Sequence, residues 1–318
     1  MRRKTLKPKR LNPGDTLAVI APASGVSEST FERGLQNLRD LGFRTKEGKY
    51  ARGGEGFLSG SDKERLHDLH WAFRDKDIDG IWCMRGGYGA SRILPEIDYK
   101  LIESNPKVFV GYSDITAIHL AIQRKTGLVT FHGPNAASTF TDYTVEHIKK
   151  TLIDPPLRQK IELPQAPEGE DPELYEAKVL KGGDCKGRII GGNLSLLIAL
   201  TGTPFGLTDV KRKILFIEDV NEQPYRVDRM LTQLRQSIDM RSLAGIAVGV
   251  FTRNEADPDE PSQSLMEVLN ERLGNLGIPV IYGLSFGHIR DQFVIPIGIR
   301  AEMNTSKSSL IYIERAVK

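Results

Sequence analysis

The sequence predicts an α/β protein whose N-terminal domain is built on a parallel sheet. The first half alternates short apolar runs with stretches of helical spacing, and the second half mixes helical and strand patterns. The length of 318 residues suits two domains of ordinary size. We expect an N-terminal domain at residues 1–153, a linker at 154–186 and a C-terminal domain at 187–318.

The N-terminal half starts with a strand and continues in β-α order. Residues 16–21 (TLAVIA) form an apolar run, and apolar residues then recur at helical spacing in 28–41. Ser61 with Glu64 three residues later is a capping box, which predicts a helix start. The remaining expected elements are strands near Arg44, at 78–84 and at 108–110, and helices from Ala90, at 115–123 and at 145–152.

The pattern breaks after the first half and then resumes. Residues 154–186 are rich in proline and acidic residues and lack periodicity, so they are predicted to be an interdomain linker. The elements expected beyond it are strands at 187–190, 213–217 and 246–250, helices at 193–200, 225–236 and 263–272, and closing strands near Val280, Val294 and Leu310.

Composition and charge exclude several classes of protein without naming a function. The net charge is only +3, and much of the basic excess lies in the first ten residues, so we expect no nucleic-acid partner. No apolar run approaches the roughly 20 residues of a transmembrane helix, and no apolar segment of a signal peptide follows the basic start. We therefore expect a cytoplasmic protein without a membrane partner.

The two cysteines, Cys83 and Cys185, are far apart and outside any CxxC spacing. Two thiols alone cannot form a zinc cluster, and a secreted chain of this size would more often carry a disulfide framework. Both are expected to be reduced, with Cys83 buried in the apolar run IWCM and no metal site.

The first segment that carries chemistry is residues 108–122, VFVGYSDITAIHLAI. A short strand ends at Gly111, and Ser113 then stands at the turn into a helix, as in a nucleophile elbow. The helix start also offers unpaired amides, notably that of Asp114, which can stabilise an oxyanion. The alternative is that Ser113 is simply the N-cap of the helix.

The second segment, residues 83–99, places Gly86, Gly87 and Gly89 directly after a strand. Glycines there let backbone amides approach a ligand closely. The spacing matches neither GxGxxG after a first strand nor the GK[ST] of a P-loop, so no nucleotide cofactor is expected. An anion or oxyanion loop and a plain tight turn both remain open.

The third segment, residues 213–234, ends its apolar strand in Glu218 and Asp219. A carboxylate at this position could orient a histidine or could cap the coming helix. Loops on a rigid scaffold are where general bases tend to sit, which favours the histidines in glycine-flanked loops. Those are His132 and His288, whereas His67, His70, His119 and His147 lie in helical patterns and are predicted to be surface or packing residues.

These segments give a possible nucleophile, acid and base in the chain order Ser113, Glu218, His288. The α/β-hydrolases share this order, but order varies freely between triad folds and carries little weight alone.

At these segments the sequence closely resembles the LD-carboxypeptidase family of serine peptidases, which includes murein tetrapeptide carboxypeptidases and microcin C immunity peptidases. The matching motifs span nearly the whole chain in the family's order. They are IAPAS (20–24), RGGYGASRILPEIDY (85–99), GYSD (111–114), FHGPN (131–135), GGNLSLL (191–197), ILFIED (214–219), PYRVDRMLTQL (224–234) and FGH (286–288).

The resemblance implies that Ser113 is the nucleophile, Glu218 the acid that orients the base, and His288 the general base. It also implies an oxyanion hole from the backbone amides of Gly87 and Asp114, with Gly86 as an alternative to Gly87.

The implied fold is a flavodoxin-like or glutaminase-like parallel-sheet N-terminal domain with a smaller β-rich α/β C-terminal domain. Because the triad residues come from both, the active site is expected at the domain interface. The resemblance also implies a homodimer that needs no cofactor.

The resemblance leaves two peptide substrates open. Murein enzymes remove the terminal D-Ala from a tetrapeptide in peptidoglycan recycling, at the bond that joins an L-centre of a diamino acid to a D-residue. Immunity peptidases cut the link to a modified aspartyl adenylate. The stretch after Glu218, DVNEQPYRVDRMLTQLR, looks like the murein branch.

A substrate with free carboxylates would need cationic partners. Arg85 and the neighbouring Tyr88 are candidate substrate contacts, whereas Arg226 and Arg229 fit structural salt bridges better. A hypothesis from another class is a non-catalytic ligand-binding module on the same two domains. The presence of all three triad residue types argues against it.

Overall fold

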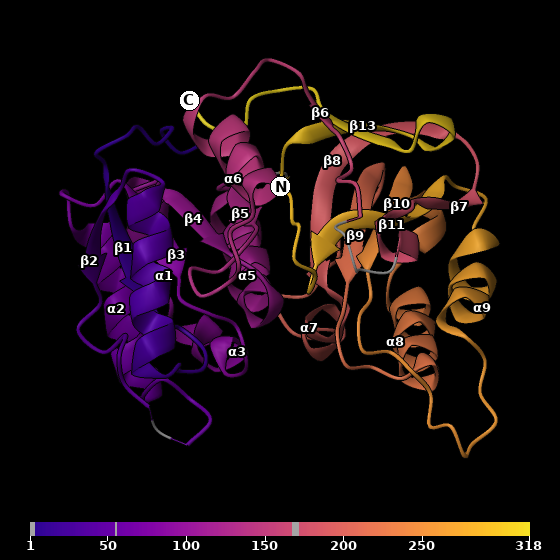
Figure 1. The fold of residues 1–318 in the computed structure, drawn as a ribbon, viewed down its shortest axis with the longest axis horizontal. Coiled ribbons are helices and arrows are strands. Elements are labelled where there is room, and N and C mark those ends of the chain that lie inside the picture. The colour runs from indigo at the N-terminus through magenta and orange to yellow at the C-terminus, as the bar shows by residue number, and fades with distance from the viewer. Residues whose placement is uncertain (1–3, 55, 167–171) are drawn as a thin grey trace. The chain divides into compact units, whose positions relative to one another are not determined.

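The chain folds into two compact units, which we describe from a computed structural model covering residues 4–54, 56–166 and 172–318. The first unit comprises Met1–Leu157, Gln292–Ile299 and Arg315–Lys318, and the second comprises Arg158–Asp291 and Arg300–Glu314. The strands of the two units form two different sheets (Figure 1). The predicted α/β class, with a parallel-sheet N-terminal region and a second sheet domain, is confirmed.

The sheet of the first unit has six strands in the order β12-β5-β4-β3-β1-β2, and all of its pairs are parallel except β12 with β5. Strands β1, β3 and β4 are buried along their whole length, as expected when helices cover both faces of a parallel sheet. The strands are β1 (Thr16–Ile20), β2 (Arg44–Glu47), β3 (Gly80–Cys83), β4 (Val108–Gly111), β5 (Thr130–His132) and β12 (Ile295–Ile297).

The two longest helices of the first unit begin at side-chain caps that the sequence offers. Ser27 accepts a hydrogen bond from the Thr30 amide at the start of α1, and Ser61 with Glu64 forms the predicted capping box of α2. The helices are α1 (Glu28–Asp40), α2 (Asp62–Arg74), α3 (Ala90–Ile93), α4 (Tyr99–Ser104), α5 (Thr116–Thr126) and α6 (Asp142–Ile148).

The sheet of the second unit has eight strands in the order β6-β14-β13-β8-β9-β10-β11-β7. Its centre, β8 to β11, is parallel, and antiparallel strands flank this centre on both sides. The strands are β6 (Gln159–Ile161), β7 (Lys178–Lys181), β8 (Asp184–Asn193), β9 (Lys213–Glu218), β10 (Gly245–Val250), β11 (Val280–Gly287), β13 (Arg300–Asn304) and β14 (Ser309–Tyr312).

Three helices accompany this sheet in the described part of the second unit. Asn193 caps α7 through its side chain, and Pro224 occupies the first turn of α8, where its missing N–H costs nothing. The helices are α7 (Leu194–Ala199), α8 (Pro224–Ser237) and α9 (Leu265–Leu269). The predicted helix at 263–272 is shorter than expected because a π-type turn, Asn270–Gly274, follows α9.

The structure differs from the predicted linker at 154–186. This segment contains β6, which pairs with β14, and β7, which pairs with β11, and its described residues belong largely to the second unit. Residues 292–299 return to the first unit, where β12 pairs with β5. The two units therefore do not follow one another simply along the chain.

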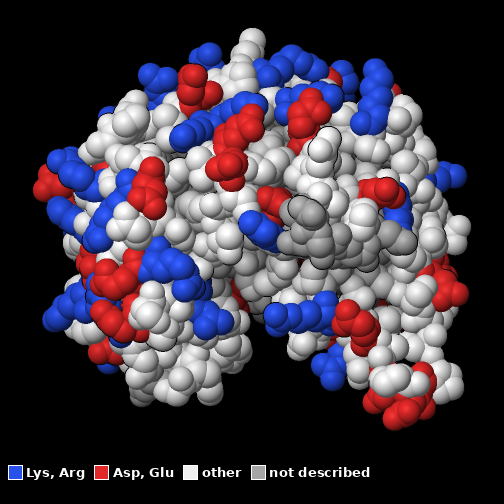
Figure 2. Space-filling model, viewed as in Figure 1, with Lys and Arg blue, Asp and Glu red and all other residues white. Residues whose placement is uncertain are grey.

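Charged side chains of both signs lie side by side on the face shown in Figure 2, in keeping with 44 basic and 41 acidic residues in the chain. Arg52 is one organised example, since its guanidinium pairs with Glu28, Glu32 and Glu47. These contacts tie the loop after β2 to helix α1. Within the described residues, no helix combines the length and apolar character required to traverse a lipid bilayer.

We expect Gly191→Ala to destabilise the second unit by about 2–4 kcal/mol. Gly191 has φ +135°, and an added Cβ would lie 1.9 Å from the Phe216 carbonyl oxygen of β9. Urea unfolding of the purified variant measures the loss. Gly182→Ala is the matched control, since nothing lies within 4 Å of its added Cβ, and it should stay within about 0.5 kcal/mol of the parent. Equal midpoints for the two variants would contradict the close approach of β8 to β9.

Candidate active site

The predicted site residues all follow the carboxyl ends of parallel strands, where open α/β sheets place their ligands. In the first unit, one loop follows β3 and the elbow follows β4; in the second unit, one carboxylate ends β9 and one histidine follows β11. The residues are Arg85, Gly87 and Tyr88 after β3, Ser113 and Asp114 after β4, Glu218 in β9 and His288 after β11.

Ser113 lies in a left-handed backbone conformation, with φ 65°. It opens a short 3-10 turn, Ser113–Ile115, that leads into α5, and the N-cap of α5 is Ile115. The alternative that Ser113 merely caps the helix is therefore wrong. A non-glycine residue in this region costs about 1–3 kcal/mol and persists only where its surroundings hold it, as functional sites often do.

Two buried side chains hold the backbone of this elbow. The Nε2 of His119 donates a hydrogen bond to the Gly111 carbonyl over 2.8 Å, and the Oδ1 of Asn135 accepts one from the Tyr112 amide over 3.3 Å. Burial lowers the pKa of His119 to about 3, so its ring stays neutral. Helical spacing predicted only a surface or packing role for His119, and nothing in the sequence singled out Asn135 beyond its place in the FHGPN motif.

The glycine loop after β3 lies against the elbow. A Cβ added at Gly86 would come within 2.8 Å of the Ser113 Cβ and 3.0 Å of the Asp114 amide nitrogen, so only glycine fits. Gly87 has φ +104°, and its added Cβ would meet the Ser24 Oγ at 2.4 Å. Geometry therefore favours glycine at both positions of this loop.

Asp114 is buried, with 3% of its surface exposed, whereas Ser113 before it is partly exposed. Burial raises the pKa of this carboxyl to about 6, against the opposing effects of the Ala90 amide and the Arg65 charge. The carboxylate accepts a hydrogen bond from the Ala90 amide over 2.7 Å.

In the second unit, the Nδ1 of His288 lies 2.7 Å from the Oε2 of Glu218. Burial lowers the pKa of His288, but the Glu218 carboxylate outweighs this by charge and hydrogen bond, so the net shift is upward. Because a carboxylate only accepts, Nδ1 donates to it, and in the neutral ring Nε2 is the nitrogen that carries no proton. This is the arrangement of an acid that orients a general base.

The backbone around this pair is fixed by two further residues. Gly287 has φ +110°, and its added Cβ would lie 3.0 Å from the Glu218 Cβ. The Thr252 hydroxyl donates to the His288 carbonyl over 3.3 Å. Thr252 follows β10, so three adjacent strand ends hold the histidine.

Asp219 bonds to the start of the preceding helix, α7, whereas the capping alternative predicted a bond to the coming helix, α8. Its Oδ2 accepts hydrogen bonds from the amide and hydroxyl of Ser195, at 2.8 and 2.7 Å, and its Oδ1 accepts from Asn193 and from the Val220 amide, both at 2.9 Å. The sequence did not show which of the two carboxylates contacts a histidine, and the structure distinguishes them by their partners. Glu218 faces the histidine, and Asp219 ties β8 and α7 to the end of β9.

The proposed substrate contacts are exposed. The Nη1 of Arg85 donates to the Gly25 carbonyl over 3.3 Å, and the Tyr88 ring packs edge-on against Phe57 at 5.2 Å between centroids. Arg226 instead lies 3.8 Å from Glu222 and 3.1 Å from the Tyr225 hydroxyl, in keeping with the structural role expected for it.

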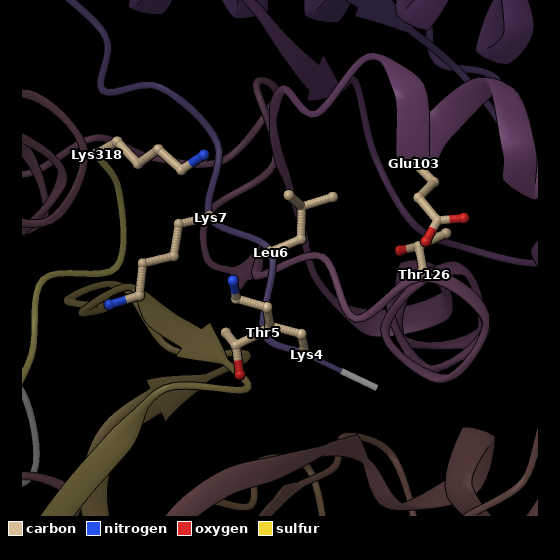
Figure 3. Close-up of a pocket in the computed structure, with 7 residues that line it drawn as sticks. All are labelled: Lys4, Thr5, Leu6, Lys7, Glu103, Thr126 and Lys318. Carbon is tan, nitrogen blue, oxygen red and sulfur yellow. The ribbon is translucent and has the colours of Figure 1, made fainter. Parts of the chain in front are cut away.

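Each unit has a hollow that lies away from the candidate residues of that same unit. One, of about 450 Å³, is lined by the N-terminal segment, α4 and the end of α5 (Figure 3). Since α5 has 11 residues, this hollow lies about 16 Å from the helix start near Ser113. The other, of about 470 Å³, lies near Asp184 at the start of β8, whereas Asn193 is at the far end of the same strand.

Comparisons with known proteins agree over most of the chain. The family model described as the LD-carboxypeptidase N-terminal domain matches residues 17–133, and that of the C-terminal domain matches residues 186–303. A probable murein peptide carboxypeptidase of Bacillus subtilis is 41% identical over 96% of this chain and 93% of its own length.

Two solved structures are also similar. The crystal structure of an MccF-like protein from Bacillus anthracis has a TM-score of 0.84 and 31% identity, covering 98% of this chain and 100% of that chain. The crystal structure of a muramoyltetrapeptide carboxypeptidase from Oxalobacter formigenes has a TM-score of 0.80 and 29% identity, covering 93% of this chain and 97% of that chain.

We expect NMR titration to place the pKa of the His288 ring above its ordinary value of about 6.5. Glu218→Gln should lower this pKa, because the neutral amide removes the charge that opposes burial. Glu222→Gln, a neighbouring change at a residue that makes no contact with the ring among the described bonds, should leave it in place. An unchanged His288 titration in Glu218→Gln would show that the 2.7 Å contact does not form in solution.

Proposed function

Because this chain belongs to the LD-carboxypeptidase family, we propose that it is a serine carboxypeptidase that releases terminal D-Ala from murein tetrapeptides. The bond cut joins an L-centre of the diamino acid to the D-residue. The observation that carries this proposal is the 41% identity to a murein peptide carboxypeptidase over nearly the full length of both chains. The hydrogen-bonded Glu218–His288 pair supplies the chemistry that such a reaction needs.

Ser113 is the proposed nucleophile. Its left-handed backbone at the end of β4 and the closeness of Gly86 support this role, because both are features of a nucleophile elbow facing an oxyanion loop. The buried hydrogen bonds of His119 and Asn135 keep the elbow in place.

The proposed reaction follows from these residues. His288 accepts the Ser113 proton at Nε2, the serine oxygen attacks the scissile carbonyl, and the ring then returns the proton to the leaving amine of D-Ala. Water, deprotonated by the same ring, attacks the acyl group and releases it from Ser113, and the ring then returns the proton to the serine oxygen. Glu218 stabilises the cation that forms twice on His288, and the amides of Gly87 or Gly86 and of Asp114 stabilise the oxyanion.

Arg85 is proposed to bind a substrate carboxylate, with Tyr88 as a neighbouring contact. Support comes from the exposed guanidinium at the oxyanion loop, which bonds the Gly25 carbonyl and leaves other donors for a ligand. A planar guanidinium suits the bidentate pairing of a peptide carboxylate.

An immunity-type peptidase that cleaves a peptidyl or aminoacyl adenylate is the second candidate. The 98% coverage of this chain by an MccF-like structure favours it, since one fold and one set of reacting residues would serve both reactions. A non-catalytic ligand-binding module would need neither the strained Ser113 nor a histidine on a buried acid.

We further propose that the enzyme acts in the cytoplasm, in peptidoglycan recycling, without a cofactor and as a homodimer. The free thiols of Cys83 and Cys185 support a reducing compartment. Light scattering on the purified protein decides the oligomeric state.

We expect Ser113→Ala to lower kcat by at least about 10³-fold while the protein stays folded. Mass spectrometry of murein tetrapeptide incubated with each variant measures the release of D-Ala, and a peptidyl adenylate incubated in parallel tests the second candidate. Ser29→Ala, on the exposed start of α1, is the control and should retain parent activity. Parent turnover by Ser113→Ala would exclude the proposed nucleophile.

We expect Arg85→Met to raise KM for the tetrapeptide by roughly 10–100-fold, the loss of one charge-assisted hydrogen bond. Arg92→Met is the matched control, because the Arg92 guanidinium already pairs with Asp62 at 2.9 Å. Steady-state kinetics on both variants gives the comparison. A KM that rises equally in the two variants would point to a general effect of surface charge.

A further inference from the structure

The buried carboxylate of Asp114 joins the two backbone segments that flank the proposed nucleophile. Asp114 directly follows Ser113, and its Oδ2 accepts a hydrogen bond over 2.7 Å from the amide of Ala90, at the end of the glycine loop. The bond therefore spans from the elbow after β4 to the loop after β3. Burying a carboxylate costs free energy, and the hydrogen bond from Ala90 offsets part of that cost. We therefore ask what role this buried acid has.

The glycine loop is also held from its other side. The Ser24 Oγ accepts a hydrogen bond from the Tyr88 amide over 3.0 Å, and the Ser24 amide donates to the Gly86 carbonyl over 3.2 Å. The buried Arg65 donates to the Gly89 carbonyl over 2.8 Å. These contacts fix the loop to the segment after β1 and to α2, but none of them relates the loop to Ser113.

Only the Asp114 contact, among these described bonds, relates the loop to the elbow. Gly86 lies close enough to the elbow that its added Cβ would meet the Asp114 amide nitrogen at 3.0 Å. A shift of the loop by a fraction of an ångström would change the spacing between the loop amides and the Asp114 amide. Oxyanion stabilisation depends on donors placed about 2.7–3.1 Å from the oxyanion, so this spacing matters for rate.

We infer that the Asp114 side chain is a positioning residue that sets the width of the oxyanion hole. It acts through the Ala90 amide and holds the Gly86–Gly87 amides at a fixed distance from its own backbone amide. This inference rests on the proposed function. It assigns two parts of one residue to the same task, since the Asp114 amide binds the oxyanion and its carboxylate places the opposing donor.

The experiment compares Asp114→Ala, which removes the acceptor, with Asp114→Asn, whose amide oxygen can still accept from Ala90. We expect Asp114→Ala to lower kcat by about 10²-fold with KM within about threefold of the parent, and Asp114→Asn to keep kcat within about tenfold. Hydrogen exchange of the Ala90 amide is measured on the same samples. If a variant loses the hydrogen bond, its Ala90 amide exchanges faster, and the inference requires that kcat of that same variant be lower than that of the parent.

Asp68→Ala is the matched control. Asp68 is also a buried acid of the first unit that accepts a backbone hydrogen bond, from the Tyr50 amide over 2.8 Å, but it lies on α2. Its loss should lower the melting temperature without changing kcat of the folded fraction.

The outcomes separate the inference from the proposed function. Full kcat in an Asp114 variant whose Ala90 amide exchanges freely would overturn the inference, as would a loss of kcat with Ala90 still protected. If Asp114→Ala does not fold, Asp114→Asn decides by the same criterion. Parent turnover in Ser113→Ala would instead overturn the proposed function, whatever the Asp114 variants do.

Discussion

Burial of the Glu218 carboxylate is the constraint on which the chemistry of the second unit depends. Its side chain has no exposed surface, and an unpaired charge there would cost several kcal/mol. The Nδ1 of His288 pairs with this carboxylate over 2.7 Å. The two residues meet because β9 and β11 run parallel, with β10 between them, and end at the same edge of the sheet. Gly287 has φ +110°, a conformation that favours glycine, and it directs the chain toward Glu218.

In the first unit, the main constraint is the strained backbone of Ser113. The left-handed Ser113 would relax if its neighbours were free to move. Hydrogen bonds that His119 donates to Gly111 and Asn135 accepts from Tyr112 fix the backbone before it, and the carboxylate of Asp114 fixes the backbone after it. The neutrality of His119 is part of this arrangement, because a charged ring in the core would be costly.

The sequence predicted the elements that local rules determine. The β-α order of the first unit followed from apolar runs and caps, and strand ends in both units then located the candidate residues. Strands β6 and β7 were missed because they are short, and their partners β14 and β11 lie about a hundred or more residues away. The motifs singled out Ser113, but its left-handed backbone and the bond from Asp114 to Ala90 depend on tertiary packing, which spacing does not record.

The division of labour between Glu218 and Asp219 shows why the two acids stand together. Successive residues at a strand end point to opposite sides, so only one of them can face His288. Burial and the charge of Glu218 raise the pKa of Asp219 to about 6, while four donated hydrogen bonds favour its ionised form. Both negative charges in turn raise the pKa of His288. A base whose protonated form is stabilised takes a proton from serine more readily. Asp219, whose hydrogen bonds have a structural role, therefore also favours the proposed reaction through its charge.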